Sequence, residues 1–539
     1  MHSRNHLFRH TLHVSGFLLA TLLLSAHTEK PARGETPPQR PNIIYIMADD
    51  LGFSDIGCYG GEVQTPNLDK LASNGMKLRT FYNNSRCCPT RASLLTGQYP
   101  HTVGMGHMVT LAQNKYDSGS YQGFLSPDHP TIAEELKKAG YRTYMSGKWH
   151  VGERREHWPV KRGFDRYFGL ISGASSFYEI TPAEKAKRFY AVDDKDYEIP
   201  AEGYYATDAF TDRAIGFITD HKKQHTAQPF FLYLAYTAPH FPLHALEPDI
   251  AKYEKIYAKG WDLARQQRYE GMKKAGYIDD RYQLTPKTKG IPDWTGDNEK
   301  DQWVRKMAVY AAMTDRMDQN IGKLVAALKG NKQLENTLIV FLSDNGGCAE
   351  SVNTKGLHDP AKKVGEKGSY SAIEEAWANV SNTPFRMYKH YMHEGGIATP
   401  FIVHWPAAIK PGKGFSDGIG HVIDLMPTAL ELAGAKQGNL PGKSISYLWR
   451  SDRQPDRTYC WEHEGNKAIR KGKWKLVRDY SDLSWELYDM QADPTEMKDL
   501  ASVESALAQA LLSEYLAWEK QVGVKEFQGK RYGNPAGAK

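Results

Sequence analysis

The chain has 539 residues, with 69 basic and 63 acidic side chains and a formal net charge of +6 at pH 7. That length is enough for two or three domains and a large buried core. A charge so close to balance, without a run of basic residues, argues against nucleic acid as a partner.

The N-terminus predicts an export signal. Residues 1–26 combine two arginines, an apolar run over 14–24 and small residues at a suitable cleavage point. The apolar run is short for a bilayer span, and a polar, proline-containing linker follows over 27–40. No later stretch reaches about 18 apolar residues. We therefore expect an exported protein, periplasmic or secreted, without stable membrane insertion.

The segments after the linker predict an α/β fold. Short apolar runs at 42–48, 229–235 and 337–343 have the character of strands buried on both faces of a sheet. Helical patterns lie between them, at 131–139 and 304–328. Such alternation predicts a large doubly wound sheet, mixed but mostly parallel, that is flanked by helices.

The character of the sequence changes near residue 440. Runs at 473–477 and 485–489 predict strands of a small antiparallel sheet, and the stretch 503–518, rich in leucine and alanine, predicts a helix packed on it. We therefore expect an N-terminal domain over 41–440 and a C-terminal α+β subdomain over 441–539.

The cysteines do not form a recognisable framework. There are five, at positions 58, 87, 88, 348 and 460. This count is too low for a disulfide scaffold, and the spacing does not resemble a zinc site. It allows one or two disulfides without indicating which cysteines pair.

Two of the predicted strands end in oxygen-bearing side chains. Asp49 and Asp50 follow the first strand, and Asp344 and Asn345 follow the last. The carboxyl ends of parallel strands lie at one edge of a sheet, where sites form. Carboxylate and amide oxygens, without histidine or cysteine, favour Ca²⁺ or Mg²⁺ over zinc. The pattern therefore predicts a hard divalent cation, although aspartates at strand ends also cap turns.

Residues 87–97, CCPTRASLLTG, carry the most specific motif of the chain. Cys87, Pro89 and Arg91 fit the pattern Cys-x-Pro-x-Arg. The segment resembles the signature of the type I sulfatases, which are arylsulfatase-like enzymes of the alkaline-phosphatase-like superfamily. In that family a maturation enzyme oxidises the first cysteine to Cα-formylglycine (3-oxoalanine), and the hydrated aldehyde is the nucleophile. The alternative interpretation is a structural cysteine in a turn before a helix.

The resemblance covers almost the whole mature chain, from residue 41 to about 500, and implies a metal site. The ligands that it implies are Asp49, Asp50, Asp344, Asn345 and one oxygen of the modified residue that derives from Cys87. Calcium is the usual metal of the family, and magnesium is the less favoured alternative.

The resemblance also assigns roles to cationic and histidine side chains. Arg91 would hold the aldehyde hydrate. In the element Gly-Lys-Trp-His, Lys148 would bind sulfate oxygens, and His150 would take a proton from the hydrate when sulfate leaves. His240 would contact the bridging oxygen and protonate the leaving group. Lys389 would be the second sulfate-binding lysine, although the residues after it differ from those of many relatives.

Three further residues have no definite assignment. Ser172 loosely matches a serine that some arylsulfatases place near the hydrate. His244 follows His240 by four residues; it either points into the cleft or, as we expect, has a supporting or surface role. His463 belongs to the segment 461–466, which would either line the substrate entrance or form a strand with a polar turn.

The sequence thus predicts a calcium-dependent sulfuric ester hydrolase that converts an aryl or carbohydrate sulfate to an alcohol and inorganic sulfate. The nearest alternative is a phosphate or phosphonate monoester hydrolase of the same superfamily, because pocket shape and charge decide between them. A non-catalytic binding protein on this scaffold would require the loss of nucleophile, ligands or lysines, and all are present. The natural substrate, the oligomeric state and the maturation enzyme stay open.

Overall fold

The computed structural model describes residues 40–109, 119–180, 188–294, 299–352, 356–451 and 455–527. The predicted signal peptide and the linker up to residue 39 lie outside the described residues. Among the residues that are described, no helix has both the length and the apolar character needed to cross a membrane.

A ten-stranded sheet runs through the larger part of the chain in the order β10-β2-β9-β8-β1-β7-β3-β4-β5-β6. Its strands are β1 (Asn42–Ala48), β2 (Met76–Tyr82), β3 (Arg142–Gly147), β4 (Arg166–Leu170), β5 (Tyr190–Val192), β6 (Lys195–Asp196), β7 (Phe230–Ala235), β8 (Thr337–Ser343), β9 (Phe401–His404) and β10 (Gly414–His421). The central strands β8, β1, β7 and β3 are parallel, whereas β9, β5 and β6 pair antiparallel with their neighbours. The predicted mixed, mostly parallel sheet is confirmed.

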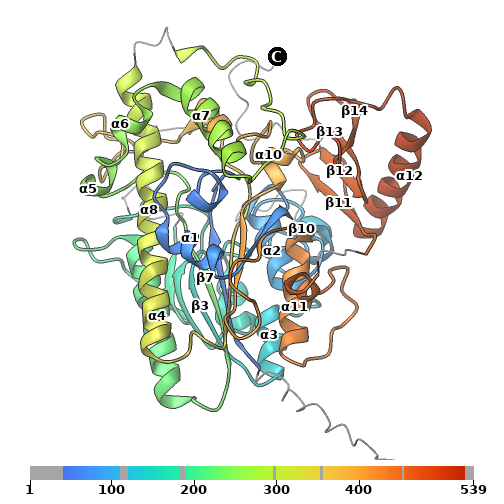
Figure 1. Ribbon diagram of the computed structural model, residues 1–539. Coiled ribbons are helices and arrows are strands. Elements are labelled where there is room, and N and C mark those ends of the chain that lie inside the picture. Colours follow the sequence, from blue (N-terminus) through green and yellow to red (C-terminus); the bar gives the residue numbers. More distant parts are fainter. Residues whose placement is uncertain are drawn as a thin grey trace, which may run out of the picture. The chain divides into compact units, whose positions relative to one another are not determined.

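Helices cover both faces of this sheet. One group is α1 (Pro66–Ser73), α4 (Ala206–Gln224), α5 (Glu247–Ile250), α6 (Glu254–Tyr257), α7 (Gly260–Lys274), α8 (Lys300–Gly330) and α9 (Glu374–Ser381), and the other is α2 (Cys87–Thr96), α3 (Ile132–Lys138) and α11 (Leu425–Leu432). The long helix α8 packs on α4, as Figure 1 shows. A short helix, α10 (Glu394–Ile397), precedes β9.

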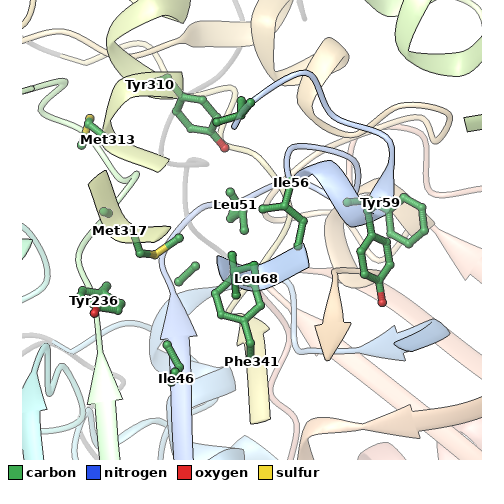
Figure 2. Close-up of a cluster of buried hydrophobic side chains, with 14 of the residues drawn as sticks. Ile46, Leu51, Ile56, Tyr59, Leu68, Tyr236, Tyr310, Met313, Met317 and Phe341 are labelled. Carbon is green, nitrogen blue, oxygen red and sulfur yellow. The ribbon is translucent and has the colours of Figure 1, made fainter. Parts of the chain in front are cut away.

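The alternation of side chains along β1 explains the two layers. Ile44 and Ile46 belong to the core beneath α8, whereas Tyr45 and Met47 belong to the core beneath α2 and α3. Figure 2 shows the first of these cores, where Ile46 lies among side chains from α1, α8 and β8. A strand that is apolar on both faces therefore becomes the centre of a doubly wound sheet.

The second sheet is antiparallel and has four strands in sequence order (red in Figure 1). They are β11 (Thr458–His463), β12 (Asn466–Lys471), β13 (Trp474–Arg478) and β14 (Trp485–Asp489), and α12 (Ser505–Val522) packs on them. This confirms the predicted small sheet with its helix. The sequence prediction contained only β13 and β14, because 461–466 is read equally well as a segment that lines the substrate entrance.

Two further details of the fold concern the start of α2 and the state of the cysteines. The structure begins α2 at Cys87, the first residue of the motif. Pro89 is compatible with this start, because an N–H in the first turn of a helix has no intrahelical partner. All five cysteines are buried and unpaired, so no disulfide forms in this structure.

Candidate active site

The acidic residues that follow β1 and β8 meet at one end of the sheet. Because the two strands are parallel and in register, Ala48 lies beside Ser343, and the chain continues from both into the same space. The backbone N–H of Asp50 donates to Asp344 Oδ1 at 3.2 Å. Asn345 Nδ2 donates to Asp50 Oδ1 at 2.6 Å. The strand register alone therefore brings the predicted metal ligands together.

The loop after β1 has an unusual backbone that aims these carboxylates. Asp50 has φ +65°, a conformation that residues other than glycine adopt at a cost of about 1–3 kcal/mol. The Tyr310 hydroxyl of α8 lies 2.9 Å from the Asp50 carbonyl oxygen and 2.7 Å from the Asp55 carboxylate. The long helix beneath the sheet thus holds the loop in this conformation.

Helix α2 places the motif cysteine at the same end of the sheet. Cys87 is the first residue of the helix, where backbone N–H groups lack partners and favour an anion. One turn later, Arg91 donates to Asp344 Oδ2 at 2.7 Å and to the Lys148 carbonyl oxygen at 3.1 Å. A hydrogen bond from Cys88 lowers the pKa of Cys87 despite its burial, and Lys148 adds to this effect. The position of residue 87 therefore favours negative charge.

Lys148 and His150 follow β3 directly. Lys148 Nζ lies 2.6 Å from Asp49 Oδ2, with both side chains fully buried. Burial lowers the pKa of His150 to about 3, so its imidazole is neutral near pH 7. The backbone N–H of His150 donates to the Ile171 carbonyl oxygen, and a Cβ on Gly173 would stand 2.3 Å from the His150 ring. Only glycine fits against the ring at that position.

His240 and Lys389 complete the group from the other side. Lys389 Nζ lies 2.8 Å from Asp50 Oδ1, and His240 Nε2 lies 3.4 Å from both Lys389 Nζ and Asp50 Oδ2. His240 Nδ1 is 2.6 Å from the carbonyl oxygen of Phe241, which can only accept, so Nδ1 carries the proton and Nε2 faces the site. Burial lowers the pKa of His240 to about 4. The structure thus brings all ten residues singled out for this site into one buried cluster.

Comparison with known proteins identifies the family. Residues 41–435 match the family model for sulfatases, and residues 385–520 match the model for the C-terminal part of N-sulphoglucosamine sulphohydrolase. The chain belongs to the sulfatase family. This membership supports hydrolysis of sulfate esters.

Individual relatives agree with this assignment. An arylsulfatase of Klebsiella aerogenes is 35% identical over 76% of this chain and 89% of its own length. A sulfatase of Schizosaccharomyces pombe is 32% identical over 90% of this chain and 94% of its own. The crystal structure of Ps i-CgsB in complex with k-i-k-neocarrahexaose has a TM-score of 0.66 at 28% identity, covering 89% of this chain and 93% of the other.

The donor set of this sulfatase fits a hard cation. Asp49 Oδ1 and Asn345 Oδ1 are buried and have no hydrogen-bond partner. Burial and the neighbouring Asp49 carboxylate raise the pKa of Asp344 to about 8, although Arg91 and Lys148 act in the opposite direction. Oxygen atoms left without partners among crowded carboxylates are what a bound Ca²⁺ or Mg²⁺ would satisfy.

The structure also places the residues without a definite assignment. Ser172 lies between Ile171 and Gly173, which both contact His150, and its Oγ accepts a hydrogen bond from the backbone of Phe189. His244 is buried, with Nε2 2.8 Å from the Ser369 carbonyl oxygen, so a surface role for it is wrong. His463 ends β11, and the residues after it turn into β12, so the segment does form a strand with a polar turn.

Sequence reasoning missed a set of charged side chains around Lys389. Glu350 Oε2 lies 3.9 Å from Lys389 Nζ, and Glu350 Oε1 lies 2.8 Å from His390 Nε2 and 2.5 Å from Arg86 Nη1. These residues come from three distant segments and share no motif, so the sequence offered no signal for them. They hold the lysine in place and keep its surroundings charged.

Proposed function

We propose that this sulfatase hydrolyses sulfate monoesters with residue 87, converted to formylglycine, as its nucleophile. The observation that carries the proposal is the position of Cys87, at the N-terminus of α2 and among Arg91, Lys148 and His150. When hydrated, the formylglycine aldehyde would supply the hydroxyl that attacks sulfur. A helix start surrounded by cations suits an anionic ester on which charge redistributes during transfer.

The cationic side chains would bind and orient the sulfate group. Lys148 and Lys389 come from distant segments of the chain, and each is paired with one of the two aspartates that follow β1. Arg91 is fully buried and braced against Asp344, so it would fix the modified residue. A calcium ion held by Asp49, Asp50, Asp344 and Asn345 would neutralise further negative charge.

The two histidines would handle protons at different steps. His240 holds its Nδ1 proton toward Phe241, so Nε2 is the atom that can protonate the departing alcohol. Although burial keeps His240 neutral in the free site, a bound sulfate ester is an anion and favours its protonation. His150 is neutral, contacts residue 87 and can accept a proton from it.

The substrate class that we propose is an aryl or carbohydrate sulfate. The relation to an arylsulfatase supports the first, and a structural relative that binds k-i-k-neocarrahexaose supports the second. We also propose that the mature protein is exported, as its N-terminal residues indicate.

Removal of His240 separates sulfate binding from departure of the alcohol. We expect His240→Ala to slow hydrolysis of a sugar sulfate by about 10²–10⁴-fold, the usual contribution of a general acid. A nitrophenyl sulfate should lose far less, because nitrophenolate leaves without protonation. Lys148→Ala is the matched variant and should slow both substrates alike, because in this proposal Lys148 binds oxygens of the sulfate group and not the bridging oxygen of the leaving alcohol.

The measurement is inorganic sulfate released from each substrate, with the nitrophenyl phosphate ester tested in parallel. Equal losses on both sulfates for His240→Ala would remove it as the general acid. Hydrolysis of the phosphate ester without release of sulfate by the unaltered protein would overturn the proposed function.

A further inference from the structure

A second cluster of side chains that could bind a metal lies where the loop after Pro100–Val103 meets the hairpin of β11 and β12. His107 belongs to the loop after the 3₁₀ turn Pro100–Val103, His463 ends β11, and Glu464 lies in the turn between β11 and β12. One nitrogen of each histidine and one oxygen of Glu464 all lie within 4.8 Å of one another. Two loops that are far apart in sequence therefore present three donors to one point.

The proton on His463 can be assigned from its surroundings. Its Nδ1 lies 3.3 Å from the carbonyl oxygen of Gly106, which can only accept a hydrogen bond, so Nδ1 carries the proton. The lone pair of Nε2 then faces Glu464 Oε1 at 3.6 Å. His463 is fully buried and Nε2 has no hydrogen-bond partner. Two electron-rich atoms thus face each other in a buried position.

The carboxylate of Glu464 also lacks hydrogen-bond partners among the described residues. Its side chain is 2% exposed, and neither carboxylate oxygen has a partner with hydrogen-bond geometry. His107 Nδ1 approaches Oε1 to 3.1 Å, and that nitrogen also lacks a hydrogen bond of good geometry. The Arg86 guanidinium acts on Glu464 from nearby, but Arg86 is itself paired with Glu350 at 2.5 Å. A buried carboxylate without good hydrogen bonds is costly unless a cation of its own accompanies it.

Neighbouring side chains hold Glu464 in place, and a small cavity leaves room for one more ligand. His390 Nδ1 lies 3.4 Å from Glu464 Oε2, while its Nε2 contacts Glu350, so Glu464 is braced on the side opposite His107. Such carboxylate–histidine contacts orient the ligands of metal sites. A cavity of about 20 Å³, bordered by His107, Glu464 and Phe527, has room for a water molecule.

We propose that His107, His463 and Glu464 bind a divalent transition metal of the zinc type. The donor set consists of two imidazole nitrogens and one carboxylate oxygen, with a fourth position open. Zinc accepts such a set, whereas Ca²⁺ prefers oxygen ligands. The metal would join the loop at 104–108 to the hairpin of the C-terminal sheet. This site uses none of the residues proposed for catalysis, and it does not depend on the proposed function.

The test is a calorimetric titration of the purified full-length protein with ZnCl₂. Transition metals are first removed with a zinc-selective chelator, and excess Ca²⁺ keeps the oxygen site filled. We expect one Zn²⁺ per chain. Glu464→Gln and His107→Gln should each weaken binding by at least about 10-fold, the lower bound for loss of even an outer-shell partner. The control His225→Gln, at the histidine that directly follows α4, should bind as the unaltered protein does.

A competing group of donors requires its own control. Cys87, Cys88 and His150 also lie within ligand distance of one another, so Cys87→Ala must retain the zinc site for the proposal to stand. Thermal unfolding without zinc shows which variants fold. Should Glu464→Gln fail to fold, His107→Gln decides, because its side chain is 26% exposed. No stoichiometric binding, unchanged affinity in His107→Gln, or loss of binding in Cys87→Ala would overturn the proposal.

Discussion

Replacing Cys87 by alanine is expected to abolish hydrolysis of sulfate esters, with a loss on the order of 10⁴–10⁶-fold, the scale on which other hydrolases respond to losing a catalytic group. The side chain begins α2 and lies buried beside Lys148 and His150, so its loss removes the proposed nucleophile from the centre of the site. The fold should persist, because alanine is a good helix former and the removed sulfur is small.

The matched control for this variant is its neighbour. Cys88→Ser keeps a small side chain that can still donate to residue 87, so most of the activity should remain. Rates of sulfate release from both variants, with circular dichroism to verify folding, give the answer. An active Cys87→Ala protein together with an inactive Cys88→Ser protein would show that the wrong cysteine has been assigned.

The second large effect is expected from Asp49→Asn, which should weaken calcium binding and lower activity together. The substitution removes one carboxylate charge from the ligand set and also the partner of Lys148 at 2.6 Å. Calcium affinity should fall by at least about 10-fold, as expected when a metal site is disturbed.

Calorimetric titration with CaCl₂ measures this affinity directly. Asp417→Asn is the appropriate control, because it removes the same charge from a side chain that is 76% exposed and pairs only with Arg79 among the ion pairs found. Unchanged calcium affinity in Asp49→Asn would remove that residue from the proposed metal site.

The sequence predicted the parts of this site that depend on strand ends and motifs. A run such as 42–48, apolar on both faces, has few placements other than the centre of a parallel sheet, so the acids after it must lie at the edge of the sheet. The Cys-x-Pro-x-Arg motif likewise predicted that Cys87 and Arg91 lie close together, because its members lie within two turns of one helix.

The remaining features arise from contacts between distant segments, which leave no local pattern. Glu350 meets Arg86 across 264 residues of chain, and His463 lies beside His107 only because the C-terminal hairpin packs against that loop. Tertiary packing decides such features, and a single sequence does not display it.

The chemical state of residue 87 is the most direct test of the proposed formylglycine nucleophile. The protein, produced in a host that matures sulfatases, is digested with trypsin, and the peptide that contains residue 87 is sequenced by tandem mass spectrometry. We expect an aldehyde in place of the thiol at position 87 and an unchanged cysteine at position 88. An unmodified Cys87 throughout a preparation that still releases sulfate at full rate would exclude formylglycine as the nucleophile.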